Sequence, residues 1–319
     1  MANNAKYWFR FPPGVSESNP RCFCVKDGWP DDAAEAFKKG IFETLSIQDF
    51  NAEGVNIPHL GLAALKVQRL ELQGLGQISG LEQFINVEII HEDFIPKNGL
   101  NLNFFPHLRS LLCNYEKGME WIFSFQPFSE LSIENFTMLD CQLPGSLVNL
   151  KKISFGGGKL RNLHGLEKCE HLTDISLGAI KTLENLDDLK NIKHLSNLNL
   201  SELPNLKEFI DLRDIKSIQT LDAFNLRVAV DLSHIGSMVK LTKFILKKVS
   251  YIGLDLDTLI SMNKLEFICL PVSEEYNVEK LQASAKKHRR TIKYIGTMGT
   301  GKSKVAHVTF EKSNGAGYD

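Results

Sequence analysis

Residues 172–194 read LTDISLGAIKTLENLDDLKNIKH, and this stretch decides the fold. Its large apolar residues recur at regular intervals, at Leu172, Ile175, Leu177, Ile180, Leu183, Leu186, Leu189 and Ile192. The first three follow the pattern L-x-x-L-x-L, in which alternate residues face one side, as in a strand with one buried face. The stretch therefore predicts a short strand followed by a helix or turn that also contributes apolar residues.

The same pattern recurs along most of the chain. Copies begin at Phe42, Val67, Val87, Leu108, Phe128, Leu150, Leu172, Leu195, Ile218, Leu241 and Leu265, with a degenerate copy at Arg289. A single copy is too small to bury its own apolar face, so stacked copies must share one continuous core. The repeats therefore predict a parallel sheet that gains one strand from each copy.

These repeats resemble the leucine-rich repeat family, whose unit is ~20–29 residues long. They are most similar to the ~22-residue subclass found in bacterial internalins and in a eukaryotic phosphatase regulator. The resemblance covers roughly residues 40–295. It implies an α/β solenoid, a horseshoe with a parallel concave sheet of about 11–12 strands and with short helices or turns on the convex side.

One position departs from the family pattern. The ninth residue of the family unit is asparagine or cysteine, and here it is Leu75, Phe136, Gly158, Ile180, Leu203, Leu226 or Val249. We therefore expect apolar side chains to pack the turn that an asparagine ladder supports in the family.

A stack of repeats exposes its core at both ends unless each end is capped. We expect an N-terminal cap of strands and one helix at residues 1–41 and repeats at 42–288. We expect the last strand and a C-terminal capping hairpin at 289–312, and a disordered tail at 313–319.

Composition excludes several classes of protein. The chain has 319 residues and a net charge of -1, so no global field attracts nucleic acid or an anionic membrane. The N-terminus lacks a secretory signal and no stretch approaches the ~18 apolar residues that span a bilayer, so we expect a cytoplasmic protein without membrane contact. The six cysteines are scattered and are predicted to be free thiols, without a zinc site or any other cofactor.

The stretch GTMGTGKS at residues 296–303 matches the phosphate-binding P-loop pattern through Gly296, Gly301, Lys302 and Ser303. A P-loop follows a strand and opens a helix whose amides hold the phosphates. Here a strand-like run lies on both sides of the motif, so we interpret it as a hairpin turn. Nucleotide binding through residues 296–303 is the weak alternative.

No catalytic motif is found, and the protein is predicted not to be an enzyme. His171 and His194 occupy the same place in successive repeats, which favours a recurring structural position over a metal site.

The basic run KKHRR at 286–290 is interpreted as a solvated helix end, and contact with nucleic acid is the alternative interpretation.

The third, fifth and seventh positions of the repeat strands are predicted to face solvent on the concave side. We expect a partner to bind there through Arg69, Glu71, Asp93, Glu130, Glu134, Lys152, Asp174, Asp222, Phe224, Lys243, Ile245 and Phe267. Acids predominate in the middle of this face, and an apolar row that also includes Ile295 follows towards the C-terminus. Two alternatives stay open: Glu130, Lys152 and Asp174 form a stabilising charge ladder, or the C-terminal strand covers the apolar row.

The predicted function is protein binding by a monomer, with a toxin or effector domain as one kind of partner. An acidic concave face suits a bacterial immunity protein that blocks a basic toxin. A cytosolic regulatory scaffold and a secreted effector are the alternatives.

Overall fold

The structure is a computed structural model that describes residues 6–10, 22–51, 53–74, 76–93, 100–125, 127–142, 147–274, 276–300 and 304–311. The tail at 313–319, predicted to be disordered, lies outside the described residues. By their internal contacts the residues divide into two units, Met1–Glu134 and Asn135–Asp319, called unit 1 and unit 2 below.

Unit 1 is a sheet that begins with an antiparallel pair and continues in parallel. Strand β1 (Lys6–Arg10) runs against β2 (Cys22–Lys26), and helix α1 (Ala33–Lys39) follows β2 in the sequence. Parallel strands then stack beside β2 in the order β3 (Thr44–Asp49), β5 (Arg69–Gly74), β7 (Ile89–Glu92), β8 (Ser110–Asn114) and β9 (Glu130–Glu134). A short parallel pair, β4 (Val55–Asn56) and β6 (Ile78–Ser79), lies in the connecting segments.

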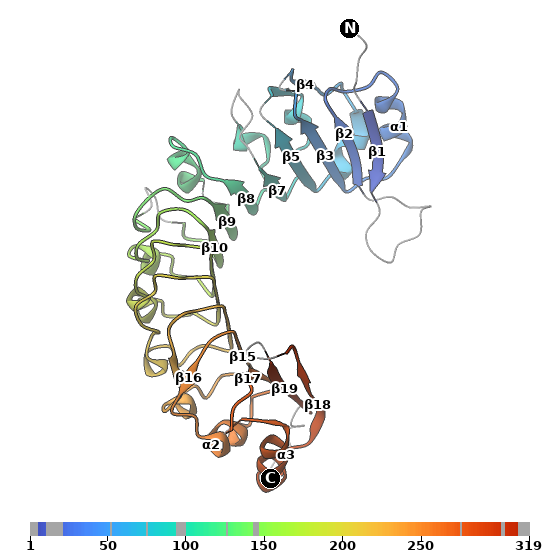
Figure 1. Ribbon diagram of the computed structural model, residues 1–319. Coiled ribbons are helices and arrows are strands. Elements are labelled where there is room, and N and C mark those ends of the chain that lie inside the picture. The colour runs from blue at the N-terminus through green and yellow to red at the C-terminus, as the bar shows by residue number, and fades with distance from the viewer. Residues whose placement is uncertain are drawn as a thin grey trace, which may run out of the picture. The chain divides into compact units, whose positions relative to one another are not determined.

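Unit 2 repeats this arrangement and ends differently. Its parallel strands are β10 (Lys152–Gly156), β11 (Asp174–Gly178), β12 (Asn197–Ser201), β13 (Thr220–Phe224), β15 (Lys243–Lys247) and β17 (Phe267–Pro271). A second parallel pair joins β14 (Val230–Asp231) and β16 (Tyr251–Ile252), and the helices α2 (Leu256–Ser261) and α3 (Val278–Lys287) follow (Figure 1).

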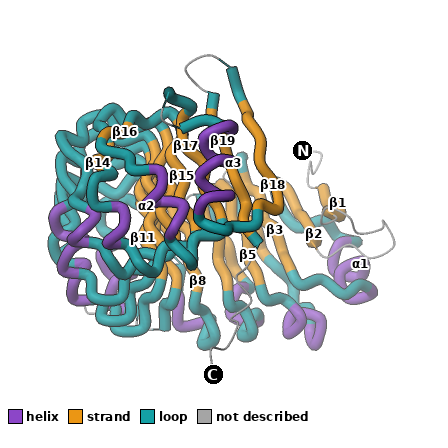
Figure 2. Tube along the Cα trace, turned by 90° about the horizontal axis from the view of Figure 1, so that it is seen from below, coloured by secondary structure: helices purple, strands orange, loops and turns teal. Residues whose placement is uncertain are grey.

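The segments between repeat strands contain short helices, as the resemblance implied. The 3-10 helices are Gly61–Lys66, Leu81–Gln83, Leu102–Phe104, Glu120–Ser124, Leu166–Lys168, Asp187–Asn191, Leu212–Asp214 and Ile235–Ser237. In each unit these helices, purple in Figure 2, lie on one side of the sheet formed by the orange strands. The side of each sheet that faces away from these helices is called the open face.

The strand positions follow the repeat pattern. Every copy from Phe42 to Leu265 contains a strand that begins two residues after the copy does. In β11 the inward residues Ile175 and Leu177 are in register with Leu198 and Leu200 of β12, and all four side chains are buried. Burying a side chain of this size stabilises the fold by about 1.5–3 kcal/mol. One parallel strand from each repeat, backed by short helices, is the leucine-rich repeat architecture, and the predicted fold is confirmed.

A backbone ladder supports the turn that ends each repeat strand. The eighth residue of the repeat has a left-handed conformation, with φ of 54° at Ala179, 53° at Glu202 and 53° at Asn225. The amide of Ala179 donates to the carbonyl of Ser201 in the next repeat at 3.0 Å, and the pattern recurs along the unit. The ninth residues Phe136, Ile180, Leu203, Leu226 and Val249 are buried beneath it, so apolar packing supports the turn as predicted.

The C-terminal edge of unit 2 differs from the expected arrangement. The degenerate copy at Arg289 was predicted to supply the last repeat strand, but its strand β18 (Ile292–Met298) does not pair with β17. Strand β19 (Val305–Phe310) lies between them and is antiparallel to both. Alternating apolar residues are compatible with either strand direction, which is why the pattern could not indicate this reversal.

Candidate functional site

The candidate site is the open face, and its predicted residues fall in both units. Unit 1 carries Arg69 and Glu71 in β5, Asp93 directly after β7, and Glu130 and Glu134 in β9. Unit 2 carries Lys152 in β10, Asp174 in β11, Asp222 and Phe224 in β13, Lys243 and Ile245 in β15, and Phe267 in β17. Each unit is described by itself below.

In unit 1 two of the predicted acidic side chains, Glu71 and Asp93, lie beside basic groups of the protein. Glu71 forms ion pairs with Arg10 of β1 and with Arg69, whose Nε lies 3.3 Å from Glu71 Oε1. Hydrogen bonding to Glu71 raises the pKa of the Arg10 guanidinium. Asp93 Oδ1 lies 3.4 Å from His91 Nε2. The predicted excess of negative charge is therefore reduced on this part of the face.

In unit 2 Asp174 belongs to a polar network between neighbouring strands. Its carboxylate accepts hydrogen bonds from Asn197 Nδ2 at 2.8 Å and from Thr173 Oγ1 at 2.6 Å. Lys152 lies opposite Asp174 in the register of β10 and β11. The bond from Asn197 links β12 to β11. The charge ladder of Glu130, Lys152 and Asp174 stays a prediction.

Five side chains gather on β13, β15 and β17, and we call them the C-terminal patch: Asp222, Phe224, Lys243, Lys247 and Phe267. Thr220 of β13 is in register with Lys243, and Phe224 with Lys247. Lys243 is exposed, and the other four are half-buried. Burial raises the pKa of Asp222, while the charges of Lys243 and Lys247 act in the opposite direction.

The two rings of the C-terminal patch are held by neighbours outside it. The ring of Phe224 lies under Lys248 Nζ, which is 5.3 Å from the ring centroid. The ring of Phe267 lies 6.4 Å from that of His307 in β19. Each ring therefore has a neighbour outside the patch and keeps part of its surface accessible.

Ile245 does not belong to the accessible surface. Its side chain is only 4% exposed and packs in an apolar cluster with Cys269 and Val305, against which Phe267 also packs. Val305 belongs to β19, so the C-terminal hairpin encloses the apolar row at this point. Ile295 of β18 is half-buried. The prediction that Ile245 contacts a partner is corrected, because β19 covers it, as in the alternative that the C-terminal strand covers the apolar row.

Sequence reasoning missed Arg10 and His307 at the open face. Arg10 lies in the cap, where no repeat register applies, whereas Lys247 follows from the seventh position of its repeat. His307 is buried in β19 and stacks on Tyr294 of β18, with ring centroids 5.2 Å apart. Only the pairing of β17 with β19 brings it to the patch.

The P-loop-like stretch is flanked by strands on both sides. Gly296 lies in β18, whereas Gly301, Lys302 and Ser303 lie outside the described residues. The residues that follow form β19, antiparallel to β18, with Met298 opposite Val305. A helix that could present its N-terminal amides to phosphates does not follow within residues 304–311.

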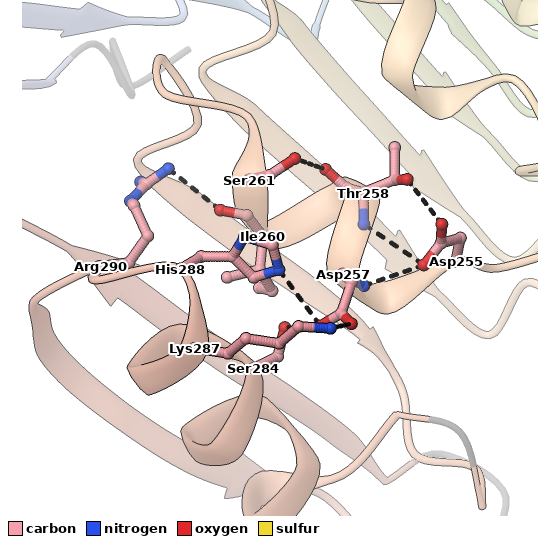
Figure 3. Close-up of polar contacts among 9 residues, drawn as sticks. All are labelled: Asp255, Asp257, Thr258, Ile260, Ser261, Ser284, Lys287, His288 and Arg290. Atoms are coloured by element: carbon pink, nitrogen blue, oxygen red, sulfur yellow. Dashed lines mark hydrogen bonds and ion pairs between the residues drawn. The ribbon is translucent and has the colours of Figure 1, made fainter.

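The basic run at 286–290 is engaged in contacts with helix α2, as Figure 3 shows. Asp257 of α2 accepts a hydrogen bond from Ser284 Oγ at 2.6 Å and forms ion pairs with Lys287 and His288. Arg290 Nη1 donates to the carbonyl of Met262 at 2.6 Å. Lys287, His288 and Arg290 therefore connect the end of α3 to α2 and the residue that follows it.

The described part of the chain gives no sign of a metal site or a membrane span. It contains no group of three or more histidine, cysteine or acidic side chains placed to hold a metal ion, and all six cysteines are buried free thiols. None of its helices has the length and apolar character needed to cross a bilayer.

Comparisons with known proteins return structures only. No protein-family model matches the chain, and no curated protein matches its sequence. Internalin C2 of Listeria monocytogenes aligns over 64% of this chain and 80% of its own, with 15% identity and a TM-score of 0.40. Internalin F of the same organism aligns over 73% and 74%, with 12% identity and a TM-score of 0.45.

A structure of the Toll–Spatzle complex of Drosophila is also similar. It covers 85% of this chain and 54% of its own, with 12% identity and a TM-score of 0.43. Because these identities are at most 15% and these TM-scores are below 0.5, the assignment of the architecture rests on the repeat register described above.

Proposed function

We propose that this protein is a non-enzymatic protein-binding module whose partner docks on the open face. The observation that supports this most directly is the C-terminal patch, where Phe224 and Phe267 lie beside Asp222, Lys243 and Lys247 on neighbouring strands. Aromatic side chains surrounded by charged groups are the residues that contribute most to protein interfaces.

The strand framework favours binding by a preformed surface. Thr220, Asp222 and Phe224 of β13 pair in continuous register with β15, and Lys243 and Ile245 of β15 pair with β17. Side chains on such a sheet are held at fixed spacings, so binding costs little ordering of the backbone. A partner with a protruding apolar element and side chains of both charges would complement the C-terminal patch.

A more specific form of the proposal is an immunity protein that neutralises a toxin or effector domain. In unit 1 Glu134 is exposed at the end of β9, whereas Glu71 already pairs with two arginines. A partner held by acidic residues alone is therefore less well supported than one held mainly by aromatic contacts. A regulatory scaffold would use the same patch.

The test is affinity capture with the tagged protein in its native host, followed by binding kinetics with variants. Phe267→Ala should speed dissociation of the captured partner by ~5–150-fold, which corresponds to about 1–3 kcal/mol. Lys243→Glu is the second variant, because this exposed side chain can change without disturbing the core. Trp121→Ala, in the 3-10 helix Glu120–Ser124 of unit 1, is the control for loss of an exposed aromatic residue.

A captured partner that binds both patch variants as tightly as the unmodified protein would show that the site lies elsewhere. A captured partner whose toxic or enzymatic activity is blocked by the unmodified protein, and not by Phe267→Ala, would support the immunity form. Capture of a partner that keeps its activity when bound would support the scaffold instead.

A further inference from the structure

A second surface of unit 2 is a groove along the edge at which the repeat strands begin. Its volume is about 600 Å³. Its lining comes from equivalent places in successive repeats: His171 precedes Leu172, and His194 precedes Leu195. Because the repeats stack in register, side chains from neighbouring repeats line up into one continuous row.

The row is basic. The groove is lined by Lys151, His171, Lys193, His194 and Lys240, all of them exposed. No aspartate or glutamate is among its lining residues, and none of these five side chains forms an ion pair within the described part of the chain. Charges of the same sign repel one another, so an anionic ligand would be favoured over a cationic one beside these lysines.

The floor of the groove is polar and contains no aromatic ring. It is formed by Thr173, Ser196, Ser217 and Gln219. Two of the hydroxyls are held in place: Ser217 Oγ donates to the carbonyl of Leu195 at 2.6 Å, and Thr173 Oγ1 donates to Asp174 Oδ2 at 2.6 Å. Hydroxyl and amide groups can form further hydrogen bonds with a polar ligand.

We propose that this groove binds an extended acidic segment of a partner protein, with glutamate or aspartate side chains opposite the lysines. The lining residues lie just before β10, β11, β12, β13 and β15 begin, so the groove passes the ends of five neighbouring strands. At ~4.8 Å between strands it is on the order of 20 Å long, which matches about six residues of extended chain. None of its lining residues belongs to the C-terminal patch, so it extends the proposed function to a second contact.

Two observations favour a peptide over a nucleic acid. Proteins that bind single strands stack bases on aromatic side chains, and the groove has none. The chain as a whole has a net charge of -1, whereas nucleic-acid binding depends on a broad basic surface that contacts many phosphates.

The experiment uses the full-length protein and fluorescence anisotropy at low salt. The probe is a fluorescein-labelled octapeptide of alternating glutamate and serine, compared with the same peptide carrying glutamine in place of glutamate. The groove variant is Lys193→Glu with Lys240→Glu. The control variant is Lys159→Glu with Lys181→Glu, two exposed lysines that follow the strands at the opposite edge of unit 2.

We expect the glutamate peptide to bind, the glutamine peptide not to bind, and added salt to weaken binding. The groove variant should lose at least tenfold in affinity, while the control variant, with the same change in net charge, stays within about twofold. Phe267→Ala in the C-terminal patch should leave peptide binding unchanged, which separates this proposal from the proposed function.

Three results would overturn the proposal. The first is no binding of the glutamate peptide at low salt. The second is an equal loss in the groove and control variants, which would indicate attraction by net charge alone. The third is tighter binding of an oligouridylate with the same number of charges, lost in the groove variant, which would assign the groove to nucleic acid.

Discussion

Glu92 and Cys113 lie opposite each other in the register of β7 and β8, and both side chains are buried in the core of unit 1. The sixth position of the repeat holds leucine or isoleucine in most other copies, so a carboxyl group here is unusual. Burial raises the pKa of Glu92 to about 7, with smaller effects of Glu116 and Asp93. Its Oε1 has no hydrogen-bond partner among the described residues.

The raised pKa of Glu92 predicts a stability that falls as pH rises. An unfolded glutamate loses its proton near pH 4.5, and the folded one near pH 7, so the unfolded state binds fewer protons between these values. The free energy of unfolding should fall by about 3 kcal/mol across this window. Urea denaturation from pH 4 to pH 8 measures it. Glu92→Gln should remove the decrease and should be more stable than the unmodified protein at pH 8.

The control for this prediction is Glu82→Gln, an exposed residue in the 3-10 helix Leu81–Gln83. It should keep the pH dependence of the unmodified protein. An identical pH profile for Glu92→Gln and the unmodified protein would show that Glu92 does not carry the effect.

A second prediction tests the register of the repeats. Leu198 is buried in β12, so Leu198→Ala should lower the free energy of unfolding by about 2–5 kcal/mol, because it removes buried methyl groups and leaves a cavity. Ser154 faces the open side of β10 and is half-buried, so Ser154→Ala should change it by less than ~0.5 kcal/mol. Thermal and chemical denaturation of both variants measures the difference. Similar losses in the two would contradict the assigned faces.

A third prediction concerns the left-handed turn at Ala179. This conformation costs a residue with a side chain about 1–2 kcal/mol, and glycine avoids the cost. Ala179→Gly should raise the free energy of unfolding by about 0.5–1 kcal/mol, since its amide still reaches Ser201. Ala229→Gly is the control, because Ala229 is exposed and its φ is not positive. It should destabilise the protein slightly, and a loss of stability in both variants would refute the prediction.

A fourth prediction assigns a structural role to Arg290. Its guanidinium donates to the carbonyls of Met262 and Leu265 and lies 4.2 Å from the ring centroid of Phe310. Arg290→Ala should lower the free energy of unfolding by about 2–3 kcal/mol, because these carbonyls lose a charged donor. Lys286→Ala, at an exposed position of α3, should have little effect. Equal stability of the two variants in urea would count against this role.

The repeat strands could be predicted from the sequence because each follows from local periodicity. Leu172, Ile175 and Leu177 indicate a strand and its buried face without reference to the rest of the chain. The same holds for the apolar ninth residues such as Ile180, whose burial was predicted because no asparagine was present. Stacking then follows, since each repeat needs its neighbours to bury its apolar face.

Whether a candidate site residue is exposed, buried or paired depends on contacts between segments that are distant in the sequence. The repeat periodicity does not predict these contacts. Ile245 was predicted to be exposed by its strand position, and it is buried because β19 returns beside β17. Glu71 was predicted to add negative charge to the open face, but Arg10 reaches it from β1, which is distant in the sequence. The contact of Arg290 with Phe310 likewise joins segments whose pairing the repeat pattern cannot specify.

The reversal of direction at β19 also bears on whether a further copy of the protein can add a strand at this end. A stack of parallel strands leaves its last strand with unpaired amides and carbonyls, an edge that a strand of another molecule can extend. Here β19 pairs with that edge of β17 and runs antiparallel to it. The outermost strand, β18, has an irregular register between Ile292 and Tyr294 and an exposed Lys293, features that discourage further pairing. At this end, strand addition by a further copy of the protein is disfavoured.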